Sequence, residues 1–84
     1  MTWQNEWKGT LSAETLAFIK AQSGDFEFCR RKTGSTATDV KMGGINFPFD
    51  ANGIASASVS ERALFDTSYT VGGDGLDSVE FQVS

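Results

Sequence analysis

The sequence predicts an α+β domain in which one N-terminal helix packs on a mainly antiparallel sheet of about four to six short strands. The clearest helical signal lies in one segment that begins near residue 13. The rest of the chain alternates apolar and polar residues in short runs separated by Gly and Asn, which is typical of strands and turns. A chain of 84 residues has apolar material for a single domain with a small core.

The helix is expected over residues 13–23. Ser12 is a favourable N-cap before it, and Gly24 is placed to end it. Leu11 and Leu16 occupy the two positions of a hydrophobic staple. The side chains expected to face the core are those of Leu16, Phe18 and Ile19.

The middle of the chain predicts short strands. Residues 25–32 alternate, and the two faces of this strand are expected to carry Phe26, Phe28 and Arg30 on one side and Glu27, Cys29 and Arg31 on the other. Residues 39–42 predict a second strand, with a break at Gly43-Gly44. Asn52-Gly53 favours a hairpin between its flanking strands, closed by a three-residue loop with a bulge, and Pro48 confines the first of them to a sheet edge or bulge.

The C-terminal part predicts a further hairpin. Residues 62–65 and 67–71 are expected to form one interrupted strand, and residues 78–83 the next. Pairing the second segment with the third sets Tyr69 opposite Phe81 and gathers the apolar residues on one face. This register requires an odd-length loop, most simply residues 73–77.

Residues 72–80, GGDGLDSVE, satisfy every fixed position of the nonapeptide G-G-x-G-x-D-x-U-x, where U is apolar. The segment resembles the calcium-binding β-roll repeat of the RTX family, over nine of the 84 residues. In those repeats a stacked neighbouring repeat completes the calcium shell, and this sequence contains one copy. We therefore expect a turn with Asp74 and Asp77 at its tip rather than a calcium site. A calcium-dependent binding module through residues 72–80 is the first alternative.

The charge distribution excludes several classes of partner. The net charge is -4, and residues 43–84 hold one basic and six acidic side chains. This balance argues against a nucleic-acid binder, whose affinity comes from neutralised phosphates, and against attachment to an anionic membrane. The polar N-terminal segment and the lack of a long apolar run predict a cytoplasmic protein, of a cell or of an infected host cell.

The composition also disfavours catalysis. The sequence contains no histidine, which removes Ser-His-Asp triads, Cys-His pairs and imidazole metal ligands. We expect no enzymatic activity, no metal site and no cofactor. The lone Cys29 is expected to be a buried, inert thiol. A small enzyme or redox protein that uses Cys29 or surface carboxylates is the second alternative.

The function expected from these exclusions is a small non-enzymatic protein-binding or assembly module. A viral or phage structural component and an inhibitor of a host protein both fit, and the partner is a second protein or another copy of the chain. Exposed aromatic and arginine side chains are typical binding anchors, while the same aromatic residues could instead belong to the core. The candidate partner-binding residues are Trp3, Trp7, Arg30, Arg31, Lys32, Phe47, Phe49, Asp74 and Asp77.

Overall fold

The computed structural model describes residues 1–75 and 78–84. In this part of the chain, seven strands and two helices follow one another. Their bounds are β1 Thr2–Gln4, α1 Ala13–Ala21, β2 Phe26–Arg31, β3 Asp39–Met42, β4 Ile45–Pro48, β5 Ile54–Ala57, α2 Val59–Arg62, β6 Tyr69–Gly72 and β7 Val79–Val83. The N-terminal strand β1 was not expected from the sequence.

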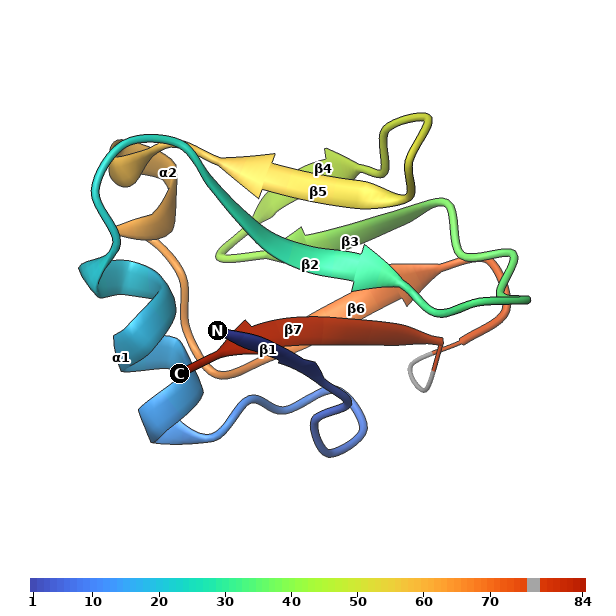
Figure 1. Ribbon diagram of the computed structural model, residues 1–84, viewed down its shortest axis with the longest axis horizontal. Helices are drawn as coiled ribbons and strands as arrows, with labels where there is room; N and C mark the ends of the chain where they lie inside the picture. Colours follow the sequence, from blue (N-terminus) through green and yellow to red (C-terminus); the bar gives the residue numbers. More distant parts are fainter. Residues whose placement is uncertain (76–77) are drawn as a thin grey trace.

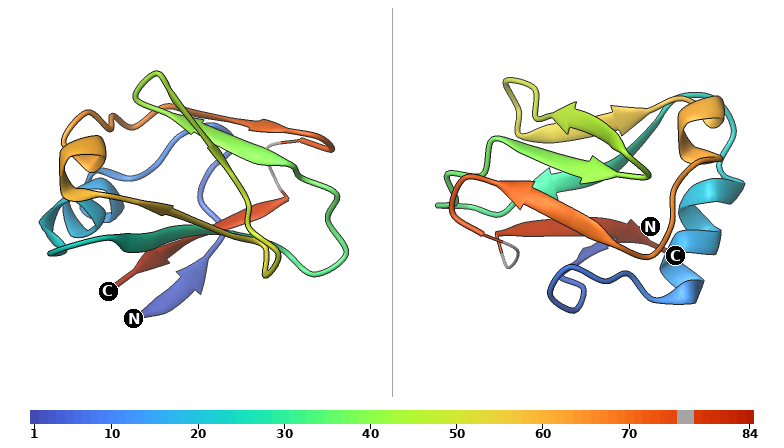
Figure 2. Two further views of the ribbon diagram at one scale, coloured as in Figure 1. Left: turned by 90° about the horizontal axis from the view of Figure 1, so that it is seen from above. Right: turned by 180° about the vertical axis from the view of Figure 1, so that it is seen from behind.

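The strands form two layers, and both helices lie at one end of them (Figure 1). Among the described residues, one antiparallel sheet has four strands in the order β1-β7-β2-β5, and the other has three in the order β4-β3-β6. Figure 2 shows the two sheets from above as separate layers. The predicted α+β class and the antiparallel pairing are confirmed. The expected single sheet is instead two sheets, because both apolar faces are buried against each other.

Helix α1 forms where the capping signals predicted it. The Ser12 Oγ accepts a hydrogen bond from the Thr15 N–H at 3.1 Å, which satisfies one of the free amides of the first turn. The helix ends at Ala21, two residues before the expected end, with Gln22 as the C-cap. Ile19 is buried as predicted, and the other two expected core residues, Leu16 and Phe18, are partly buried against the core.

Strand β2 departs from simple alternation because it contains a β-bulge. Its pairing with β5 shifts between Glu27 and Cys29, so that Phe28 is the extra residue. Phe28 and Cys29 are both fully buried, and Arg30 lies beside Glu80 on the opposite side of the sheet. The prediction that Phe28 and Arg30 share one face is therefore wrong, because the extra residue reverses the alternation after it.

A two-residue turn at Gly43-Gly44 joins β3 to β4. Both glycines have positive φ, +56° and +81°, as a type I′ hairpin turn requires. The expected break is thus a tight hairpin, and the bounds predicted for the preceding strand match β3. Pro48 ends β4, which is an outer strand of its sheet, so its missing N–H costs no central hydrogen bond.

Two predicted hairpins are wrong in their pairing. Asn52-Gly53 does lie in a turn, but β4 on one side pairs with β3 and β5 on the other pairs with β2. Likewise β6 pairs with β3, whereas β7 lies between β1 and β2. The rings of Tyr69 and Phe81 still meet, with centroids 4.8 Å apart, from facing sheets rather than from neighbouring strands. The predicted register pairs the apolar side chains of these segments as neighbours within one sheet, whereas they meet across the core between the two sheets.

The short helix α2 replaces the strand predicted over residues 62–65. Ser58 and Glu61 form a capping box, in which the Ser58 N–H donates to the Glu61 carboxylate at 2.8 Å and the Glu61 N–H donates to the Ser58 Oγ at 3.3 Å. The Ser-x-x-Glu spacing is a pattern by which the start of a helix can be recognised in a sequence.

Within residues 1–75 and 78–84, no helix has the length and apolar character needed to cross a membrane.

The core between the sheets is an aromatic cluster centred on Phe28. The Phe28 ring contacts those of Phe47, Phe65 and Phe81, with centroids 5.2, 5.0 and 6.3 Å away. Phe47 was proposed as a partner-binding residue, and this placement contradicts that role because a buried ring presents no surface.

Candidate functional site

The outer face of the four-stranded sheet gathers three of the side chains that can contact a partner. Arg30 on β2 lies opposite Glu80 on β7, and Trp3 on β1 lies opposite Gln82, the next residue of β7 on that face. The Arg30 Nε donates to the Glu80 carboxylate at 3.0 Å. The Arg30 guanidinium carbon also lies 4.8 Å from the centre of the Trp3 ring, a cation–π contact. We call Trp3, Arg30 and Glu80 the outer-face cluster.

The bulge in β2 is what places Arg30 in this cluster. Without the extra residue, alternation would carry Arg30 to the same side as Phe28, into the core. Burying an unpaired guanidinium there would be costly. The bulge therefore lets one strand contribute consecutive apolar residues to the core and still present Arg30 on the opposite surface.

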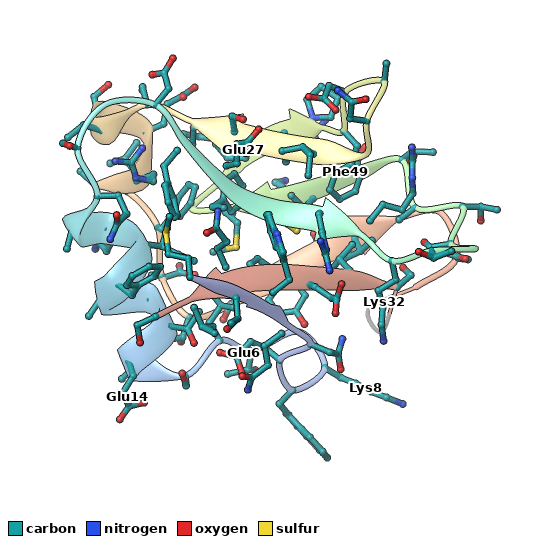
Figure 3. All side chains as sticks on the ribbon, viewed as in Figure 1. Glu6, Lys8, Glu14, Glu27, Lys32 and Phe49 are labelled. Carbon is teal, nitrogen blue, oxygen red and sulfur yellow. The ribbon has the colours of Figure 1, made fainter. Side chains whose placement is uncertain are left out.

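Trp7 is the most exposed aromatic side chain among the described residues, at 79%. It follows β1 in a turn that includes Gly9 at φ +71°. The Trp7 carbonyl accepts hydrogen bonds from the Thr10 N–H at 2.9 Å and from the Tyr69 hydroxyl at 3.1 Å. Lys8, next in the chain, projects from the same loop (Figure 3). The backbone under the indole is thus fixed to the fold while the indole itself faces solvent.

Arg31 and Phe49 lie apart from the outer-face cluster. The Arg31 Nη1 donates to the Ala37 carbonyl at 2.9 Å, and its guanidinium carbon is 5.8 Å from the centre of the Phe49 ring. Phe49 is partly buried against the core. Phe49 and Lys32 both lie toward the end of the molecule opposite the helices (Figure 3). The predicted basic cluster Arg30-Arg31-Lys32 is therefore divided between different surfaces, because successive residues of a strand point to opposite faces.

The loop after β6 is held to the loop between β2 and β3. The Asp74 carboxylate accepts hydrogen bonds from the Thr36 N–H at 3.0 Å and from the Ser35 hydroxyl at 3.3 Å. A Cβ on Gly73 would lie 2.7 Å from the Thr36 carbonyl oxygen, so this close approach requires glycine. Packing accounts for this glycine of the nonapeptide. Asp77, the other predicted tip residue, lies outside the described residues.

Hydrogen bonding to the Thr36 amide lowers the pKa of Asp74 below its ordinary value. A carboxylate with a lowered pKa in the fold stabilises it above the unfolded pKa of about 3.9, and that contribution disappears as the pH falls through the folded pKa. We expect the melting temperature of the Asp74→Asn variant to be lower than that of the parent at pH 7 and to fall less below pH 4. Thermal unfolding followed by circular dichroism measures this, with the exposed Asp25→Asn as control. Equal pH profiles for the parent and Asp74→Asn would contradict the role of Asp74.

Cys29 is buried, and burial raises the pKa of its thiol well above the ordinary value, which favours the neutral form. In the part of the chain that the structure describes, no three Cys, Asp or Glu side chains lie close enough together to hold a metal ion.

The structure adds two charged residues that the sequence did not single out. Glu80 positions Arg30, and its role depends on strand register, which has no local signal. Arg62 is fully buried at the junction of the two helices.

Comparison with protein-family models, with curated proteins and with solved structures finds no match to this chain.

Proposed function

We propose that the chain is a non-enzymatic protein-binding module, and that its contact surface comprises the outer-face cluster and Trp7. The observation that carries this proposal is the exposure of the Trp7 indole, 79%, on a backbone turn hydrogen-bonded to the fold. A large apolar side chain in water has free energy to gain from burial by a partner. Because its backbone is already ordered, little conformational entropy is lost when the partner binds.

The chemistry around Trp7 supports a protein as the partner. Tryptophan and arginine are the residue types most enriched at binding hot spots, and Trp3, Trp7 and Arg30 supply both. Arg30 and Glu80 neutralise each other, so the cluster has no excess charge that would attract a polyanion.

Two biological roles fit such a module. A structural component of a virus or phage would bind further copies of itself, whereas an inhibitor of a host protein would bind one foreign partner in a fixed ratio. Size-exclusion chromatography with light scattering over a range of protein concentrations separates them. Growth of the mass with concentration supports assembly, and a constant monomer mass supports a foreign partner, which is then sought by affinity capture.

The Trp7→Ala variant should lose at least about 2 kcal/mol of binding free energy, or about 30-fold in affinity, for whichever partner is found. Its stability should change by less than about 0.5 kcal/mol, because the indole is exposed. Calorimetric titration measures the affinity, and thermal unfolding measures the stability.

Leu64→Ala is the matched control, since Leu64 is a large apolar side chain, 62% exposed, that follows α2. It should leave the affinity unchanged. Equal losses of affinity in Trp7→Ala and Leu64→Ala, or no loss in either, would refute the proposed surface.

A further inference from the structure

The guanidinium of Arg30 is held in place by two contacts, but only one of its nitrogen atoms donates a hydrogen bond within the described residues. Its Nε is bonded to Glu80 and one of its faces covers Trp3, but its two Nη atoms have no hydrogen-bond acceptor among residues 1–75 and 78–84. Its side chain is 41% exposed. The outward edge of the group therefore presents N–H donors to solvent in a fixed orientation.

The other arginines of the chain do not share this arrangement. Arg31 uses an Nη to bond the Ala37 carbonyl. Arg62 donates through Nε and both Nη atoms to backbone carbonyls and is fully buried. Three arginines with different donor use give an internal comparison within one protein.

We propose that the Nη edge of Arg30 receives the carboxylate of an aspartate or glutamate side chain from the protein partner. This inference rests on the proposed function and names the chemistry of the partner at that surface. The two parallel donors of a guanidinium edge match the two oxygens of a carboxylate, so one planar group can be bound by two hydrogen bonds. Glu80 and Trp3 fix the orientation before binding, which reduces the rotamer entropy lost when the pair forms.

The surroundings of Arg30 favour a carboxylate on a protein over a free anion or a nucleic-acid phosphate. Glu80 lies 3.0 Å from the Arg30 Nε and repels a second anion, so an inorganic ion without further contacts gains less than a carboxylate on a peptide-like group. A protein side chain adds contacts of its own with the ring of Trp3 and removes water from the ion pair, which strengthens the pair. The net charge of -4 opposes a polyphosphate chain.

The test uses a defined probe and the Nε–Hε NMR signals of the arginines. The probe is N-acetyl-glutamate methylamide, and its neutral counterpart is N-acetyl-glutamine methylamide. We expect the glutamate probe to shift the Arg30 signal more than the Arg31 signal and to leave Arg62 unchanged, while the glutamine probe shifts none of them. Equal shifts at Arg30 and Arg31, or equal effects of the two probes, would overturn the inference.

Two variants test the fixed orientation. Trp3→Leu removes the stacking contact, so the Arg30 signal should then respond no more than that of Arg31. With an identified partner, Arg30→Lys keeps the charge but loses the paired donors, and it should weaken binding nearly as much as Arg30→Gln. Full retention of affinity in Arg30→Lys would refute the two-bond geometry.

These outcomes are separable from those that test the proposed function. If Trp7→Ala leaves partner binding unchanged, the proposed surface is wrong, and the probe titration still decides whether Arg30 selects a carboxylate. If Trp7→Ala weakens binding but the probes do not distinguish Arg30 from Arg31, the surface stands and the acidic partner residue is rejected.

Discussion

Replacing Arg62 with alanine should lower the free energy of unfolding by about 3 to 5 kcal/mol. The Arg62 guanidinium is fully buried and donates hydrogen bonds to the backbone carbonyls of Ile19, Gln22, Gly24 and Ala57. Three of these carbonyls belong to the last turn of α1 and the residues just after it, where helix carbonyls lack partners of their own. Alanine would remove the side-chain donor from each of them, and the Ile19 carbonyl would keep only its bond from the Gln22 N–H at 3.4 Å.

The electrostatic setting explains how a buried arginine is tolerated here. No carboxylate in the described residues forms an ion pair with Arg62. Its charge lies instead at the negative end of the α1 macrodipole, and its guanidinium carbon is 5.7 Å from the centre of the Phe26 ring. The side chain joins α1, α2 and β5, so its loss should affect the whole fold and not one helix alone.

Urea unfolding followed by circular dichroism measures this effect. A domain of this size is typically stable by roughly 5 to 15 kcal/mol, so Arg62→Ala could be partly unfolded without urea. Arg62→Lys keeps the charge and some of the donors, so its free energy of unfolding should lie between those of Arg62→Ala and the parent. Arg30→Ala is the matched control, with an expected loss of no more than about 1 kcal/mol because its ion pair is on the surface. A loss in Arg62→Ala no greater than in Arg30→Ala would contradict this account.

Phe28→Ala is the second substitution with a large expected effect, a loss of about 3 to 5 kcal/mol. The Phe28 ring is fully buried and lies at the centre of the aromatic cluster between the two sheets. Removing it leaves a cavity that the rings of Phe47 and Phe65, also packed edge to face on each other, cannot close by small shifts.

Two variants serve as controls for Phe28→Ala. Phe28→Leu keeps most of the side-chain volume, so it should lose less free energy of unfolding than Phe28→Ala. It also keeps the comparison measurable if the alanine variant does not fold. Phe49→Ala removes the same side chain from a partly buried position and should cost clearly less. If Phe49→Ala destabilised the protein as much as Phe28→Ala, the cluster would not be centred as described.

Elements with local signals could be predicted from the sequence, and pairings between distant segments could not. The N-cap at Ser12 and the short strand at residues 39–42 depend on neighbouring residues alone, and both predictions are confirmed. The partner of β6 depends instead on how two apolar faces fit together across the core, which alternation within one segment does not encode. The same reason explains the failure at Asn52-Gly53, where the turn is present and the hairpin is not.

The candidate site was predictable as a set of residue types and not as an arrangement. Trp3, Trp7 and Arg30 were selected because aromatic and arginine side chains anchor interfaces. Their arrangement depends on the bulge at Phe28, which places Arg30 on the outer face of the sheet and which has no signal in the local sequence. Exposure of Trp7 depends on the fold around its loop, since its polar neighbours fit a core position or a surface position equally well.

The place of β7 in its sheet has a consequence for the order of folding. Residues 79–83 are the last strand along the described chain, yet they lie between β1 and β2. During synthesis, β1 and β2 therefore have no common partner until these residues have left the ribosome. Contacts between strands so distant in sequence are typical of slowly folding domains. A nascent chain that stops before residue 79 would lack the buried side chains of Val79 and Phe81, so the rings of Phe28 and Tyr69 would lose their contacts with Phe81.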